Sequence, residues 1–361
     1  MSKTILYLTI LLLLGFGIYY FIFNNNNASP YSGTEAGFTI KDTGSIGKIF
    51  IAGADGESVL LERGDGSWTV NKRYKILPST LRMVLNTFTQ QSALYPVTKS
   101  AVDNVIKNLS TDGIKVEVYD RAGKKMKVFY VGGASVNNTG TNMLMDGASM
   151  PYVVQVPGFV GYITPRYTTR LSDWRDRTIF NIAPDEIQSI SVQYLDNPIN
   201  SFVITRDKDS INVTADKSLM TGLDGKNSRR AKIYLTYFTN INCEGYLNGL
   251  EDMDTTIKTA PKESMIDITG MHGEHQHVDI YWMALNKRSK NIATHAEGIP
   301  DDYDADRMYA IMNNNQDTVM IQRYAFRNIF HKAFEFFQKD IPADKRRKEV
   351  PSKNVLMNNH M

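Results

Sequence analysis

The spacing of apolar and polar positions changes along this chain. Near the N-terminus, residues 5–23 form a run of 19 residues without a charge. As a helix rising about 1.5 Å per residue, the run would span roughly 28 Å, close to the thickness of a bilayer's hydrocarbon core. We therefore expect a transmembrane anchor over residues 5–23, preceded by a cytoplasmic stub of residues 1–4.

A cleavable signal peptide is the alternative interpretation of this run. Signal peptides end in small residues, whereas this run ends in the bulky residues 19–23, and the first small pair is Ala28-Ser29. That ending favours a retained signal-anchor. No cysteine comes just after the run, which argues against a lipid-modified N-terminus.

The orientation of the anchor follows from the basic residues around it. Lys3 precedes the run, and no Lys or Arg follows until Lys41. The positive-inside rule then leaves the N-terminus in the cytoplasm and exports the bulk of the chain. We expect a single-pass protein of the bacterial inner membrane with its body in the periplasm.

Beyond a tether rich in Asn, Ser and Gly at residues 24–37, apolar residues alternate as they do in strands. Three short strands separated by Asp-Gly turns are expected around residues 49–51, 59–61 and 68–70. A helix follows, because Leu81, Val84, Leu85 and Phe88 have the i, i+3, i+4, i+7 spacing of one helical face.

A second short helix, a hairpin and two more strands complete this pattern. The helix carries Val102 to Leu109, and the hairpin turns at Gly123. The two further strands are expected at residues 143–145 and 152–156.

The same order of elements recurs further along the chain. The apolar residues of the second helix, Ala231, Tyr234, Leu235 and Phe238, lie 150 positions after those of the first, and Gly273 lies 150 positions after Gly123. We therefore expect an internal duplication and an α+β fold. Two similar domains, each mostly antiparallel sheet with inserted helices, would occupy residues 38–181 and 182–338, followed by a basic disordered tail at 339–361.

The amino-acid composition excludes some classes of protein. A hydrophobic content of 42% and a charged content of 22% are typical of a globular chain, and a net charge of +3 is too small to indicate nucleic-acid binding. The single cysteine, Cys243, is expected to be a small buried residue. Phosphate-loop, nucleophile-elbow, HExxH and CxxC motifs are missing from the sequence, so we expect neither enzymatic activity nor a cofactor.

Several segments resemble a known family, the domain-of-unknown-function 4340 family, over most of residues 38–240. The resemblance is carried by residues 48–50, 66–71, 131–133, 151–154 and 170–180, the last of which contains the Trp-Arg-Asp element. Its Bacteroidetes branch is the most similar. The resemblance implies a bacterial envelope protein with one N-terminal anchor, and for some members a gliding-motility-type ABC transporter as partner. It implies no catalytic residues.

The element from Asp173 to Arg177 lies where the two expected domains join. Its alternating charges suit a structural joint with Trp174 packed beneath. Alternatively, Trp174, Arg175 and Arg177 could bind an anionic ligand or a partner in a cleft between the domains.

The densest group of histidines lies at residues 272–277. On a strand, His275 and His277 would point to one face, where paired imidazoles can bind a metal such as zinc or copper. At an offset of 150 residues the first domain has lysines there instead, which favours a solvated hairpin over a metal site.

Three other patterns have two interpretations each. Asp302, Asp304 and Asp306 begin like a calcium loop, but the glycine and glutamate that such a loop needs are absent, which favours an acidic loop before a strand. A last helix should bury Phe326, Phe330, Phe334 and Phe337 and leave Phe336 free for a partner or membrane surface. The basic residues Lys345, Arg346, Arg347 and Lys348 are expected to be solvated, or to contact anionic lipid.

The functional expectation follows from the anchor, the duplicated body and the missing catalytic motifs. We expect a non-enzymatic binding or scaffold protein of the cell envelope, accessory to a transporter or to a gliding or secretion-type machine. A periplasmic receptor for a glycan or lipid is the first alternative, and a metal-dependent envelope hydrolase using His275 and His277 is the second.

Overall fold

A computed structural model of the chain describes residues 34–208, 210–219, 226–291, 299–314 and 316–337. The expected anchor at 5–23, most of the tether and the tail at 339–361 lie outside these residues. Within the described ranges, no helix has the length and apolar character needed to cross a membrane. Two compact units are present, and the boundary between them falls between Asp176 and Arg177.

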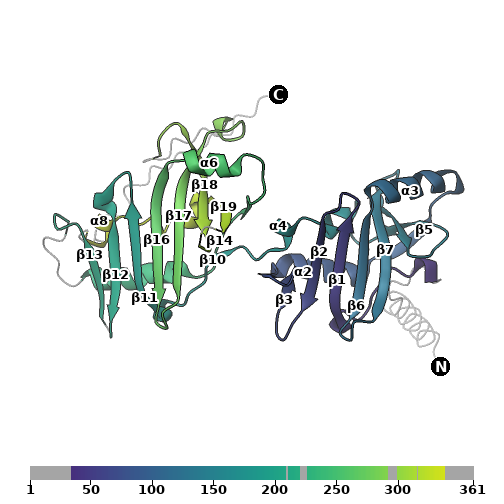
Figure 1. The fold of residues 1–361 in the computed structure, drawn as a ribbon, viewed down its shortest axis with the longest axis horizontal. Helices are drawn as coiled ribbons and strands as arrows, with labels where there is room; N and C mark the ends of the chain where they lie inside the picture. The colour runs from purple at the N-terminus through teal and green to yellow at the C-terminus, as the bar shows by residue number, and fades with distance from the viewer. Residues whose placement is uncertain (1–33, 209, 220–225, 292–298, 315, 338–361) are drawn as a thin grey trace, which may run out of the picture. The chain divides into compact units, whose positions relative to one another are not determined.

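The first unit is built on one antiparallel sheet of nine strands in the order β4-β3-β2-β1-β6-β7-β8-β9-β5 (Figure 1). Turns with a glycine at positive φ, namely Gly56, Gly66 and Gly123, connect three of its hairpins, as expected from the sequence. Its strands are β1 (Ile46–Gly53), β2 (Ser58–Arg63), β3 (Trp68–Val70), β4 (Tyr74–Lys75), β5 (Ser92–Pro96), β6 (Ile114–Asp120), β7 (Lys125–Ala134), β8 (Thr141–Met145) and β9 (Tyr152–Gln155).

Helix α2 (Pro78–Gln90) covers one face of this sheet. Proline at its first turn suits a helix start, because the missing N–H has no intrahelical partner there. Val84 and Phe88 are buried in the main core, and Leu81 and Leu85 pack against it, so the predicted helical face is confirmed. The remaining short helices are η1 (Thr34–Ala36), η2 (Thr43–Ser45), η3 (Thr164–Tyr167) and α4 (Leu171–Trp174).

Helix α3 (Lys99–Asp112) packs on the opposite face of the first sheet. Its Val105 and Leu109 form a small apolar cluster with Tyr130 of β7. Side chains alternate along a strand, and the neighbours of Tyr130 in β7, Phe129 and Val131, belong to the main core. The first sheet therefore has a helix on each face.

The second unit contains an antiparallel sheet of eight strands in the order β13-β12-β11-β16-β17-β18-β19-β15, and a separate pair, β10 with β14. The strands are β10 (Thr178–Phe180), β11 (Ile187–Tyr194), β12 (Phe202–Asp207), β13 (Ser210–Ala215), β14 (Ile241–Asn242), β15 (Gly245–Tyr246), β16 (Lys262–Gly270), β17 (His275–Ala284), β18 (Tyr303–Met312) and β19 (Asp317–Gln322).

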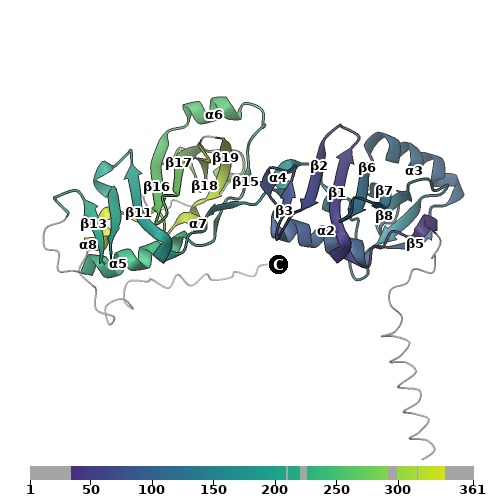
Figure 2. The ribbon, with the colours of Figure 1, turned by 60° about the horizontal axis from the view of Figure 1, so that its bottom comes forward.

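Helix α5 lies along one face of the second sheet, and α6 lies on the other side (Figure 2). Ala231, Tyr234, Leu235 and Phe238 are buried as predicted, and so is Cys243. The helices of this unit are η4 (Pro184–Glu186), η5 (Pro198–Asn200), α5 (Lys226–Leu235), η6 (Thr236–Phe238), α6 (Met253–Thr259), η7 (Ser289–Asn291), α7 (Arg323–Phe326) and α8 (Ala333–Phe337).

The prediction for the last aromatic helix is wrong in two places. The side chain of Phe336 is 1% exposed and belongs to the core, whereas Phe334 is 37% exposed. The cause is a break in the helix: α7 ends at Phe326 and α8 begins at Ala333, so the stripe that starts at Phe326 does not continue. Within α8, Ala333 and Phe336 are three residues apart and both face the core.

Both units are mostly antiparallel sheet with a few helices, which makes the fold α+β. The order of strands from β3 to β5 in the first sheet matches the order from β13 to β15 in the second. Helix α5 follows β13 directly, and α2 follows β3 after the two-residue strand β4. The internal duplication itself stays a prediction.

Candidate functional site

The best candidate site lies on the second sheet, on the face opposite its core. We call it the polar face. Along β11, β16 and β17 its side chains alternate with those of the core. It comprises Ser189, Ser191, Gln193, Met265, Asp267, Thr269, His275, His277, Asp279 and Tyr281.

His277 lies at the centre of a chain of charged groups on this face. Its Nδ1 is 2.7 Å from a carboxylate oxygen of Asp267, and its Nε2 is 3.1 Å from one of Asp279. The other oxygen of Asp279 accepts hydrogen bonds from Lys262, at 2.9 Å, and from the Tyr281 hydroxyl, at 3.4 Å. A neutral imidazole donates only one hydrogen bond, so the contacts at both ring nitrogens fit a protonated ring. With His277 and Lys262 charged, the two cations balance the two carboxylates.

The surroundings of His277 change its pKa. Burial alone would lower the pKa, but the hydrogen bond with Asp267 and the charges of Asp267 and Asp279 outweigh burial, so the pKa of His277 is raised. For Lys262, burial is likewise outweighed by its bond to Asp279, and its pKa is raised. His277 and Lys262 therefore keep their protons to higher pH than isolated histidine and lysine side chains would.

The polar face continues beyond the histidine hairpin in rows that cross the sheet. In one row, Asp267 pairs with His277 on one side and with Ser191 on the other. Ser191 in turn pairs with Val203, and Val203 with Thr214 of β13. Side chains directly opposite one another share a face, so the row reaches across five strands.

A hollow of about 650 Å³ lies at the β11–β13 end of this face. Hydroxyl, amide and carboxylate groups of Ser191, Gln193, Thr214 and Asp216 line it, beside apolar groups of Leu195, Pro198 and Val203. The mixture suits a ligand that offers both hydroxyl groups and apolar edges.

The register of the hairpin changes the comparison between the two units. In the first hairpin Tyr119 pairs with Lys125 and Val118 with Lys127, so one residue, Met126, forms a β-bulge. In the second hairpin Thr269 pairs with His275 and Ile268 with Gln276, without a bulge. Beyond the bulge, the position that matches His277 is therefore Val128. Lys127, which the constant offset assigns to His277, matches Gln276 instead.

The predicted metal ligands His275 and His277 are close to each other but already have polar partners. His275 Nε2 is 3.6 Å from the Asp267 oxygen that contacts His277, and the side chain of His275 is 59% exposed. A metal ion on His277 would have to displace Asp267 or Asp279. Among the described residues, no group of three or more His, Cys, Asp or Glu side chains is arranged to hold a metal.

The predicted ligand-binding residues Trp174, Arg175 and Arg177 divide between the two units. Trp174 is fully buried in the first core, and its indole N–H donates to the Thr168 carbonyl at 2.8 Å. The Arg175 guanidinium lies 3.8 Å from the centre of the Tyr74 ring. Arg177 belongs to the second unit, where its carbonyl accepts from the Cys243 N–H. Their predicted role in ligand binding stays a prediction.

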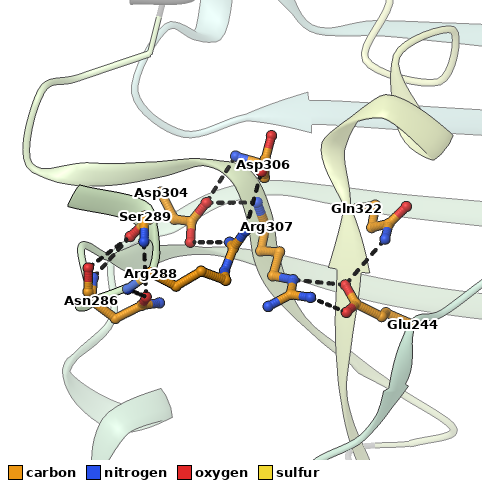
Figure 3. Close-up of polar contacts among 8 residues, drawn as sticks. All are labelled: Glu244, Asn286, Arg288, Ser289, Asp304, Asp306, Arg307 and Gln322. Atoms are coloured by element: carbon orange, nitrogen blue, oxygen red, sulfur yellow. Dashed lines mark hydrogen bonds and ion pairs between the residues drawn. The ribbon is translucent and has the colours of Figure 1, made fainter. Parts of the chain in front are cut away.

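The acidic segment at residues 302–306 contains a buried carboxylate. Asp304 has no exposed side-chain surface, and one of its oxygens accepts from the backbone N–H groups of Asp306 and Arg307. Its other oxygen accepts from Arg288 at 2.8 Å, and Arg288 also contacts Asp306 (Figure 3). The cation that Asp304 pairs with is thus an arginine of the same chain.

Arg307 forms a second ionic contact on the same strand. Its guanidinium donates two hydrogen bonds to the carboxylate of Glu244, which also accepts from Gln322 at 3.3 Å (Figure 3). Glu244 precedes β15 and Gln322 ends β19, so the pair stabilises the edge of the sheet. The remaining predicted site residues, Lys345, Arg346, Arg347 and Lys348, lie outside the described residues.

Sequence reasoning found His275 and His277 but missed Asp267, Asp279 and Lys262. A usable signal was present, because the turn at Gly273 fixes the pairing of the hairpin. The Gly270 N–H bonds to the Glu274 carbonyl, and counting outward from that pair places Asp267 opposite His277.

Comparison with known proteins adds one match. Residues 89–262 match the family described as "Domain of unknown function (DUF4340)". The chain resembles the DUF4340 family. The match begins at the end of α2 and runs to the start of β16, so it includes parts of both units, and it leaves out the segments at 48–50 and 66–71 that also suggested the family. Neither the curated proteins nor the solved structures contain a match.

Proposed function

We propose that this DUF4340-like chain is a non-enzymatic binding or scaffold protein of the bacterial cell envelope. A helix over residues 5–23 anchors it in the inner membrane, and its two units lie in the periplasm. The observation that carries the proposal is the polar face of the second sheet. Its charged groups balance one another in a fixed chain, which suits recognition of a partner more than turnover of a substrate.

The origin and the partner belong to the same proposal. A Bacteroidetes-type envelope protein that is accessory to an ABC transporter, or to a gliding or secretion-type machine, agrees with the anchor sequence and with the family resemblance. The matching strand orders of the two sheets support an internal duplication, after which the second copy took on the binding role.

A site-specific crosslinking experiment tests the proposal. A photo-reactive amino acid is placed at Gln193, which is exposed on the polar face, or at Lys107, which is exposed on α3 of the first unit. In intact cells, Gln193 should crosslink to one reproducible membrane-associated protein, and Lys107 should not. Recovery of the same abundant proteins from both positions would contradict a specific partner on the polar face.

A periplasmic receptor for a glycan or lipid is the second candidate function, and the hollow beside Gln193 favours it. The hollow lies within the second unit, whereas the sequence suggested a cleft between domains. Native mass spectrometry of the full chain in detergent should then show a retained small molecule, which Gln193→Ala weakens and Lys107→Ala does not. No binding across a broad panel of sugars and lipids would exclude this function.

A further inference from the structure

The two sheets have four edges, and three of them are protected against pairing with another chain. Edge strands β4 and β15 have only two residues each, and β5 ends at Pro96, which has no N–H to donate. The fourth edge, β13, has six residues, Ser210 to Ala215, with no charge and no proline. Short strands, charges and prolines are the usual means of blocking edge pairing, and β13 has none of them.

The outer edge of β13 has backbone groups available for a new strand. β13 pairs with β12 over its whole length, and among the described residues no strand pairs with its other edge (Figure 1). An edge strand leaves a row of N–H and C=O groups that can pair with a further strand. Ile211 and Val213 face the core and are buried, while Asn212 and Thr214 are exposed on the opposite face.

We propose that the β13 edge pairs with β13 of a second copy of this chain, so that two second sheets join into one continuous antiparallel sheet. In the register centred on Asn212, each Asn212 lies opposite the other. Ile211 then lies opposite Val213 on the core side, and Ser210 opposite Thr214 on the other side. Apolar residues therefore meet apolar residues, and polar residues meet polar ones.

The charges next to the strand fit the same register. Lys208 lies in the turn before β13, and Asp216 follows the end of the strand. Antiparallel pairing about Asn212 directs Lys208 of each copy towards Asp216 of the other. Both ends of the paired strands thus bring opposite charges together, which favours a second copy over a strand with arbitrary flanking charges. The inference does not rest on the membrane anchor or on the polar-face partner.

A disulfide trap tests this pairing in the full chain, in membranes. Residues opposite one another in an antiparallel pair have Cα atoms about 4.5–5.5 Å apart, within the range a disulfide can span. Asn212→Cys should therefore give a disulfide-linked dimer after mild oxidation. Thr205→Cys is the matched control, because Thr205 is exposed on the same face one strand further in. Its Cα atoms would lie about 10 Å further apart, so it should not crosslink.

A charge variant provides a second, independent readout. Asn212→Lys places two like charges opposite each other and should weaken dimerisation of the detergent-solubilised chain about tenfold or more, whereas Thr205→Lys should not. A monomeric wild type, equal crosslinking of Asn212→Cys and Thr205→Cys, or a dimer unchanged by Asn212→Lys would each overturn the proposal. Capture of a different protein by Asn212→Cys would do so as well.

Discussion

Apart from the short strand β4, the sheets of the two units have the same strand order, but the face opposite the main core differs between them. In the first unit, the 14-residue helix α3 buries Val105 and Leu109 against that face. In the second, the corresponding helix α6 has seven residues and none of them is buried. The face that packs against α3 in the first unit corresponds to the polar, partly exposed face of the second sheet. The same face of the sheet is thus packed against a helix in the first unit and stays polar and partly exposed in the second.

The largest expected effect tests whether polar groups stabilise the second unit as apolar contacts stabilise the first. Asp304→Ala removes a buried carboxylate that accepts three hydrogen bonds, so it should lower the free energy of unfolding by about 3 kcal/mol. Chemical denaturation measures this. Asp306→Ala, at a side chain that is 50% exposed, is the control and should change stability by less than about 0.5 kcal/mol. Equal effects would mean that burial of Asp304 is unimportant.

A smaller effect is expected from the covering helices. Leu109→Ala in α3 should cost about 2 to 3 kcal/mol, because it leaves a cavity in a small buried cluster. The matched change in α6, Ile257→Ala, should cost less than 1 kcal/mol, as a rough expectation for a side chain that is not buried. Chemical denaturation of the full chain measures the loss of stability for each variant, and hydrogen exchange shows in which unit the loss occurs. If both changes cost the same, α6 covers its sheet as α3 does, and the contrast between the faces fails.

The pH dependence of stability tests the charged chain on the polar face. Because the pKa of His277 is raised in the folded protein, its contribution is complete below about pH 6.5, the usual value for an unfolded histidine, and is lost as pH rises through the folded pKa. Wild type should therefore lose thermal stability relative to His277→Gln when the pH is raised through that range. His272→Gln, at an exposed turn position, serves as the control. A constant difference between wild type and His277→Gln across the range would show that the ring is not held in its charged form.

The smallest expected effect concerns metal at His275 and His277. Since Asp267 and Asp279 already engage His277, added zinc should change the melting temperature of wild type and of the double variant His275→Ala, His277→Ala by the same amount. Metal analysis of the purified protein should show no stoichiometric zinc, copper or manganese. Stoichiometric metal that is present in the wild type and missing from the double variant would favour the alternative of a metal-dependent hydrolase.

Much of the fold follows from local patterns. The spacing of Val84 and Phe88 predicted α2 and its buried face, and the turns at Gly123 and Gly273 predicted both hairpins. These elements are predictable because burial of one face and a positive φ at a turn glycine depend on residues close in sequence. The burial of the aromatic residues near the C-terminal end of the second unit was not predictable in this way. A break in the helix between Phe326 and Ala333 decides which aromatic side chain faces the core.

The candidate site was predictable only in part. The two histidines stood out by composition, but their partners did not, because aspartates on a strand look like solvated residues until the cross-strand pairing is known. The comparison at a constant offset also failed beyond Met126. A single bulge shifts every later position of β7 relative to β17, and the sequence contains no sign of the bulge.

The bulge at Met126 is a local shift in the pairing of β6 with β7. It confines a mismatch of one residue to a single point, and the ladder on either side stays regular. A hairpin with such a defect can lose that residue without turning its buried side chains outward. Deletion of Met126 would make the first hairpin match the second in length and register, and would leave Phe129 facing the core. A hairpin can therefore differ in length by one residue between two units, while the order and the inward faces of their strands stay the same.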